Sequence, residues 1–130
     1  MILKAGYTKE GVSFFTPNHF SQQLGYMAHP KGKVIEPHTH NSVTRTVTYT
    51  QEVLFIRSGK LRADFYTEDQ VYIESVVLSA GDVILLASGG HGFECLEPTE
   101  MIEVKQGPYS GELDKQRFNP IEKDNLIVHE

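Results

Sequence analysis

The feature that most constrains the fold is a succession of short segments rich in β-branched and aromatic residues, with no helical pattern of useful length among them. Segments of this composition, separated in many places by Gly, Pro, Asn, Asp or Ser, are typical of β-strands. Residues 58–60 and 67–70 are short enough to form hairpin turns between such strands. Many short strands with regular turns predict an all-β sandwich or small barrel rather than an α/β fold. The expected strands cover residues 12–16, 24–29, 44–59, 60–67, 70–79, 82–88, 91–97 and 100–107.

The chain of 130 residues has the length of one ordinary domain. We expect residues 1–106 to form that domain, because the strand patterns lie there. Residues 107–130 are polar, broken by Gly and Pro, and show little periodicity. We therefore expect an irregular C-terminal tail that packs on the domain or reaches a partner subunit.

Charge and cysteine content bear on partners and compartment. The formal net charge is -5 with no basic stripe, so a nucleic-acid surface, which needs clustered Lys and Arg, is not expected. No stretch approaches the roughly 20 apolar residues of a membrane span, and the first residues lack the apolar region of a signal peptide. Because Cys95 is the single cysteine, no internal disulfide can form. We expect a cytoplasmic protein with neither nucleic acid nor membrane as a partner.

Two histidines one residue apart give the first chemical signal. In a strand, residues i and i+2 point to the same side, so His38 and His40 would project together and could grip one metal ion. The alternative is a pair of exposed histidines on a loop. Glu52 favours the metal site, because it opens an apolar run in which an unpaired carboxylate would be costly to bury. His91, which follows an apolar strand and a Gly-Gly turn, is the fourth candidate ligand.

The third and fourth candidates also have structural interpretations. His91 could be a buried, hydrogen-bonded histidine. Glu52 could pair with an arginine, for which the candidates are Arg45, Arg57 and Arg62. Three imidazoles and one carboxylate would leave open positions on an octahedral ion, which is the arrangement of a catalytic site rather than a closed structural one.

The spacing of these residues resembles the first sequence motif of the cupin superfamily. That motif places a glycine before a His-x-His pair, then a glutamate, then a glycine seven residues after the glutamate. The residues that match it are Gly32, His38, His40, Glu52 and Gly59.

The second cupin motif is also matched. It begins with glycine and an acidic residue before an apolar strand and ends in histidine, as Gly81, Asp82 and His91 do here. The resemblance covers about residues 32–105. Two differences are the eleven residues between His40 and the glutamate, which we interpret as an elongated loop or strand extension, and the absence of the usual prolines before His91.

The resemblance implies an all-β, cupin-type double-stranded β-helix (jelly-roll) barrel with one divalent ion per chain, Fe, Mn, Ni or Zn, held by His38, His40, Glu52 and His91. Similar proteins isomerise sugars, oxygenate substrates or decarboxylate acids. One hypothesis is therefore a metal-dependent isomerase, dioxygenase or lyase that acts on a sugar or organic acid, with no apparent general base other than Glu52. The alternative is a non-catalytic binding or accessory cupin linked to surface-polysaccharide or nucleotide-sugar metabolism. We also expect a homodimer, since an all-β chain must protect its edge strands.

Several other residues are candidates for contacts with a substrate. Arg45 lies in the segment inserted before Glu52, where a guanidinium could hold a carboxylate or phosphate, although an exposed surface arginine is the alternative. Tyr49, Gln51 and Arg62 are similar candidates.

Two residues beyond His91 share its strand parity. Phe93 and Cys95 are therefore expected to face the interior, where Phe93 could contact a substrate. We expect Cys95 to be a small buried hydrophobe, since free cysteine is among the most buried residue types.

Overall fold

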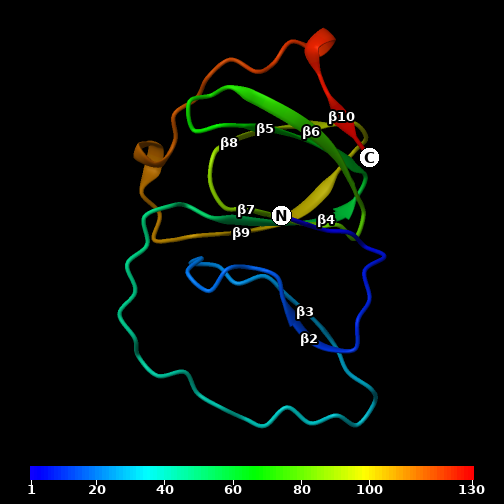
Figure 1. Cartoon of the computed structure of the whole chain (residues 1–130), viewed down its shortest axis with the longest axis vertical. Coiled ribbons are helices and arrows are strands. Elements are labelled where there is room, and N and C mark those ends of the chain that lie inside the picture. The colour runs from blue at the N-terminus through cyan, green and yellow to red at the C-terminus, as the bar shows by residue number, and fades with distance from the viewer.

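The computed structural model describes residues 1–130 as a mostly-β structure, in which two four-stranded sheets face each other and a two-stranded hairpin forms a third, separate sheet (Figure 1). The β4 sheet contains, in order, β1 (Ile2–Leu3), β7 (Val83–Leu86), β4 (Glu52–Ser58) and β9 (Glu100–Lys105). The β5 sheet contains, in order, β10 (Val128–His129), β6 (Tyr72–Ser79), β5 (Lys60–Tyr66) and β8 (Gly90–Cys95). The hairpin pairs β2 (Gly11–Phe14) with β3 (Gly25–Ala28). Neighbouring strands are antiparallel except β10, which runs parallel to β6.

The prediction of an all-β chain is confirmed, but the strand pairing does not close the two sheets into a barrel. β8 and β9 follow each other in the chain, yet β8 pairs with β5 and β9 pairs with β4. Both are therefore edge strands, one in each sheet. The only helical segments are two short 3-10 turns in the tail, η1 (Gly111–Asp114) and η2 (Lys123–Asn125).

The main core fills the space between the two sheets. Leu54 and Ile56 of β4 point into it, whereas Val53 belongs to a second cluster on the outer face, as the two-residue period of a strand requires. Fully burying one such aliphatic side chain stabilises the fold by about 1.5–3 kcal/mol. The buried members of the main core are Leu54, Ile56, Ile84 and Leu86 from the β4 sheet and Leu61, Ala63 and Leu78 from the β5 sheet.

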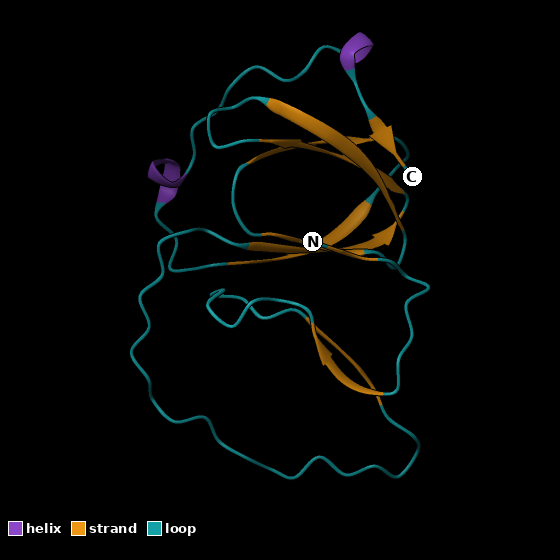
Figure 2. Cartoon of the chain, in the orientation of Figure 1, coloured by secondary structure: helices purple, strands orange, loops and turns teal.

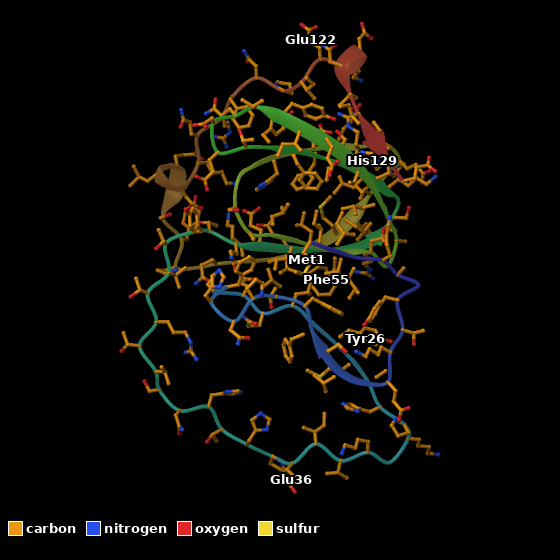
Figure 3. The ribbon with its side chains drawn as sticks, viewed as in Figure 1. Met1, Tyr26, Glu36, Phe55, Glu122 and His129 are labelled. Carbon is orange, nitrogen blue, oxygen red and sulfur yellow. The ribbon has the colours of Figure 1, made fainter.

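The β2–β3 hairpin covers part of the outer face of the β4 sheet. Leu24, just before β3, is buried against Val53 and Leu85. Phe55 lies on the same outer face, between β4 and the hairpin (Figure 3), but it keeps 42% of its surface exposed. The hairpin therefore covers this face only in part.

The two predicted hairpin turns have different outcomes. The turn at 67–70 is confirmed, because β5 and β6 pair and the Thr67 N–H donates to the Val71 carbonyl at 2.8 Å. The turn at 58–60 is wrong, because β4 and β5 belong to different sheets and the chain crosses between the sheets there. Gly59 makes this crossing with φ of 81°, and a Cβ there would lie 2.1 Å from the Pro98 carbonyl oxygen. Only glycine fits that position.

The predicted strand over 44–59 forms only from Glu52 onward. Residues 29–51, which we call the connection, join β3 to β4 without regular structure (Figure 2). The connection passes around the far side of the hairpin before it returns to β4 (Figure 1), and Glu36 lies at its outer end (Figure 3). Residues 43–51 lack a strand beside them to complete a hydrogen-bond ladder, so local β-propensity alone does not make them a strand.

The C-terminal tail packs against the outer side of the β5 sheet. The backbone N–H of Ile121 donates to the Tyr66 hydroxyl, and that of Ile127 donates to the Tyr72 hydroxyl, each at 3.0 Å. The Phe118 ring contacts the Tyr66 ring edge to face, with centroids 5.0 Å apart. The tail then ends in β10, which extends the sheet beside β6 (Figure 1).

Asp82 fastens the turn that precedes β7 to the N-terminal segment. Asp82 is 3% exposed, and its carboxylate accepts hydrogen bonds from the backbone N–H groups of Ala5 at 2.8 Å and Ser79 at 3.0 Å. The Lys4 ammonium lies 3.2 Å away. Burial by itself raises the pKa of Asp82, but the two N–H groups and Lys4 outweigh it, so the pKa is lowered. The ionised carboxylate is therefore a structural element.

The substitution Asp82→Ala removes the carboxylate oxygens that accept hydrogen bonds from the backbone N–H groups of Ala5 and Ser79, and leaves these partly buried N–H groups unpaired. We expect the free energy of unfolding at pH 7, measured by urea denaturation, to fall by about 2–4 kcal/mol. Because the folded-state pKa is lowered, this stabilisation is present above the ordinary aspartate pKa and is lost as the pH falls through the folded value. The difference between wild type and variant should therefore shrink in acid.

The matched control is Asp69→Ala, which removes an exposed carboxylate from the 67–70 turn. We expect this control to change stability by less than about 0.5 kcal/mol. An Asp82→Ala variant as stable as the Asp69→Ala control at pH 7 would contradict the role given to Asp82.

Candidate functional site

An ion pair between the two sheets marks the candidate site. Glu52 is the first residue of β4 and is 7% exposed, and the Nε2 of His91 in β8 lies 3.1 Å from its Oε2. In the ladders, His91 stands opposite Phe65, which packs on the main core, so its side chain points to the inner side of the β5 sheet. Glu52 and His91 thus meet across the space between the sheets.

The glycines before His91 explain how the chain reaches this position. Gly89 has φ of 78°, and a Cβ there would lie 2.6 Å from the Tyr66 carbonyl oxygen. A Cβ on Gly90 would lie 3.0 Å from the Phe118 ring. The Gly-Gly turn therefore lets β8 start close against the end of β5 and the tail, which aims His91 inward.

The charges around Glu52 keep it ionised. The hydrogen bond from His91 lowers the pKa of Glu52 more than burial raises it, and the positive charges of His91, Lys105 and Lys115 lower the pKa further. Lys105 stands directly opposite Glu52 on β9, with its Nζ 3.9 Å from the Glu52 Oε1 and 3.9 Å from the Glu103 Oε1. The end of the sandwich thus carries a mixed set of acidic and basic groups.

A cleft of about 820 Å³ opens at this end. Glu52, His91, Phe93 and Glu103 line it from the strands of both sheets. Its rim is formed by residues 48–50, 67–70 and 114–118, which come from the connection, the β5–β6 turn and the tail. The volume is within the range of pockets for small molecules, about 300–1,000 Å³.

The structure brings together two of the four predicted ligands, Glu52 and His91, but not the other two. His38 and His40 lie on the connection, both exposed, with ring centroids 5.2 Å apart. The Nδ1 of His38 lies 3.0 Å from the Glu36 carbonyl, which is its only hydrogen-bond contact. No group of three or more His, Cys, Asp or Glu side chains is close enough to hold a metal ion. The prediction that His38 and His40 lie on a strand is wrong, because no neighbouring strand pairs with that segment.

Arg45 and Tyr49 line a second hollow of about 1230 Å³, which lies between the connection and the segments 18–23 and 105–110. Tyr49 also reaches the rim of the cleft. Arg45 contacts only the Val43 carbonyl, at 3.4 Å. The guanidinium is therefore not part of the Glu52–His91 site in this conformation.

Gln51 and Arg62 are engaged in structural contacts. The Gln51 Oε1 accepts hydrogen bonds from the Ser21 hydroxyl at 3.1 Å and the Gln22 N–H at 2.9 Å, and so holds the 18–23 segment against β4. Arg62 forms a bidentate pair with Asp64, at 2.7 and 3.0 Å, on the β5 face that points away from the core. Neither residue lines the cleft.

Phe93 and Cys95 both stand opposite core residues of β5, which confirms that they face the inner side. Phe93 lies beside His91, with ring centroids 5.4 Å apart, and is 40% exposed in the cleft. The prediction that Cys95 is buried is wrong. The cause is that β8 is an edge strand, so its inner face is incompletely covered.

Two charged residues of the site were missed by sequence reasoning. Glu103 and Lys105 are two residues apart on β9, and both lie on the side of the strand that faces Glu52. The signal was the spacing of Glu103 and Lys105, because residues two apart in a strand share a face and would both face Glu52 if the two strands paired. It required knowledge that these two strands are neighbours, which the sequence does not supply.

Comparisons with protein-family models, with curated proteins and with solved structures find no match. No helix in the structure has the length and apolar character that a membrane span requires. The chemistry of the site must therefore follow from its own residues.

The contact between Glu52 and His91 predicts a measurable titration. In a carbon-13 NMR titration of the glutamate carboxyl groups, we expect Glu52 to titrate below the ordinary glutamate range. The His91→Phe variant removes the hydrogen-bond donor and the positive charge, so the pKa of Glu52 should rise. Because the folded pKa is lowered, the pair stabilises the fold above the ordinary glutamate pKa and is lost as the pH falls through the folded value.

His19→Phe is the matched control, since His19 is exposed and outside the cleft. It should leave the Glu52 titration unchanged. An identical Glu52 pKa in wild type and His91→Phe would mean that the imidazole does not hold the carboxylate.

Proposed function

We propose that the chain is a cupin-type protein that binds a small polar molecule, a sugar or an organic acid, in the cleft beside Glu52, with the help of one divalent ion. The observation that carries this proposal is the Glu52–His91 pair at 3.1 Å, in which a carboxylate from one sheet meets an imidazole from the other. Oxygen and nitrogen donors that converge from facing strands at the edge of a cleft are the basis of a metal site between sheets.

The structural roles of the motif glycines support the cupin-type fold. Gly59 marks the crossing from the β4 sheet to the β5 sheet, with φ of 81°. Gly81, with φ of 89°, precedes the Asp82 anchor at the start of β7. Two of the glycines that resemble the cupin motifs thus lie at turns of the two-sheet structure, which supports the proposal.

The donor chemistry suits a divalent first-row ion such as Fe, Mn, Ni or Zn. Glu52 is ionised, as a ligand must be. In this proposal the ion is held by Glu52 and His91, and His38 and His40 complete the set from the connection. Glu52 lies twelve positions after His40, and the eleven residues between them could span up to about 40 Å when extended, so chain length permits this approach.

The remaining residues in the cleft and beside it suit an acidic or hydroxylated ligand. Lys105, beside Glu52, and Lys115, on the rim, can neutralise a carboxylate of the ligand. The exposed ring of Phe93 offers an apolar face for the carbon skeleton. A divalent ion, when bound, would polarise a carbonyl or carboxylate oxygen of the same molecule.

A second candidate is a metal-free binding or accessory protein. The observation that favours it is that Glu52 and His91 already form a hydrogen bond with each other, while His38 and His40 do not join them in a group of possible metal ligands. The two candidates predict different behaviour toward metal ions.

The test is equilibrium dialysis of tag-free protein against Mn²⁺, Ni²⁺, Zn²⁺ and, without oxygen, Fe²⁺, followed by elemental analysis. We expect about one ion per chain in the wild type. Glu52→Gln and His91→Ala should each weaken binding at least tenfold, which is about 1.4 kcal/mol. The double variant His38→Ala, His40→Ala should do the same.

The double variant His19→Ala, His29→Ala is the control for the loss of two imidazoles, because both residues are exposed and neither lines the cleft. It should bind metal like the wild type. Folded wild-type protein that binds none of the four ions would refute the metal-dependent form and leave the metal-free binder. Metal binding that survives loss of His38 and His40 would remove those two residues from the site.

A further inference from the structure

Residues 43–50 have the composition of a strand and no strand beside them. Six of the eight residues are β-branched, Val43, Thr44, Thr46, Val47, Thr48 and Thr50, and Tyr49 adds an aromatic ring. Such residues favour pleated, half-buried surfaces. Yet no residue from 34 to 50 makes a backbone–backbone hydrogen bond within the chain. A row of free N–H and C=O groups on a strand-forming segment is a template for pairing.

The chain itself offers no partner for this segment. On one side of β4, β9 ends at Lys105, and the last bond of that ladder joins the Gln106 N–H to the Gln51 carbonyl at 2.9 Å. On the other side, β7 ends at Leu86, opposite Glu52. Both neighbouring strands therefore stop opposite the first residue of β4, and neither continues alongside residues 43–50.

The sequence of the segment is complementary to itself when two copies run antiparallel about Val47. In that register, Val47 faces Val47, Thr46 faces Thr48, Thr44 faces Thr50 and Arg45 faces Tyr49. All threonines then lie on one side of the ribbon, and the valines, arginine and tyrosine lie on the other. Cross-strand threonine pairs and Val–Val contacts are each favourable, by about 0.2–1 kcal/mol.

The charges also fit this register. Arg45 is the only charged residue of the segment, and it would lie beside the tyrosine ring of the other copy, where a guanidinium is attracted to the aromatic face. The two arginines would be four residues apart along the ribbon, roughly 14 Å at the rise of a strand. No like charges therefore oppose each other.

We propose that residues 43–50 form an antiparallel two-stranded ribbon with the same residues of a second copy of the chain, centred on Val47. The pairing has two-fold symmetry, in which one patch meets itself, so it closes at a dimer. It gives backbone partners to groups that have no backbone–backbone hydrogen bond in the single chain. Because eight residues per chain make a small interface, we expect association in roughly the micromolar range. The inference does not depend on the proposed metal or ligand.

The test uses cysteine cross-linking in a Cys95→Ser background, since Cys95 is exposed. Directly opposed residues of an antiparallel pair have Cα atoms about 4.5–5.5 Å apart, within disulfide range. Under mild oxidation we therefore expect Val47→Cys to give mostly covalent dimer. Thr46→Cys is the matched control, because its two copies would be diagonal neighbours about 7–8 Å apart. The pair Thr46→Cys, Thr48→Cys should restore the cross-link.

A second measurement needs no cysteine. Sedimentation should show wild-type dimer at high concentration and monomer for Val47→Pro, which cannot complete the ladder. The thermal midpoint measured at a dilution where the wild type is also monomeric should stay unchanged, because Val47 lies outside both cores.

Three results would overturn the proposal. The first is a Val47→Cys chain that stays monomeric while the wild type also sediments as a monomer. The second is Thr46→Cys cross-linking as fast as Val47→Cys, which would reject the register. The third is hydrogen-exchange protection of residues 43–50 in a monomer, which would place the partner strand in the same chain.

Discussion

The buried carboxylate of Glu52, at the start of β4, is the constraint around which the candidate site is organised. Glu52 is almost fully buried at the edge of a core made of leucine and isoleucine, where an unpaired charge would be very costly. The opposite sheet supplies His91, and the neighbouring strand supplies Lys105. The need to compensate one charge thus brings together an acid, a base and an ammonium group at the edge of a cleft.

The rest of the fold serves to hold that end in place. The main core fixes the distance between the two sheets, and the Gly89–Gly90 turn aims His91 into the gap. On the outer side, the tail packs on the β5 sheet through Tyr66 and Phe118, next to the same turn. A change in the tail could therefore reach the site through the Gly-Gly turn, as well as through the charge of Lys115 on the rim of the cleft.

Much of the fold followed from local patterns, since strand composition and two-residue alternation are properties of short segments. The sequence also placed Glu52 and His91 in one site, as two of the four metal ligands that the cupin resemblance implies, but it did not predict the hydrogen bond between them. What local patterns could not supply was strand pairing. Without it, the 58–60 turn was taken for a hairpin, Lys105 went unnoticed beside Glu52, and the pattern from Thr44 to Gln51 was taken for part of a strand although no strand lies beside it. The placement of His38 and His40 failed for the same physical reason, since a strand exists only beside another strand.

The most direct test of the central claim is a crystal structure of the zinc-loaded protein, with zinc located by its anomalous scattering. We predict one peak per chain, about 2.0–2.2 Å from a carboxylate oxygen of Glu52 and from the Nε2 of His91. The ion would then take the place of the hydrogen bond between the two side chains. A well-ordered map with no peak beside Glu52, or with zinc bound only by His38 and His40, would contradict the account.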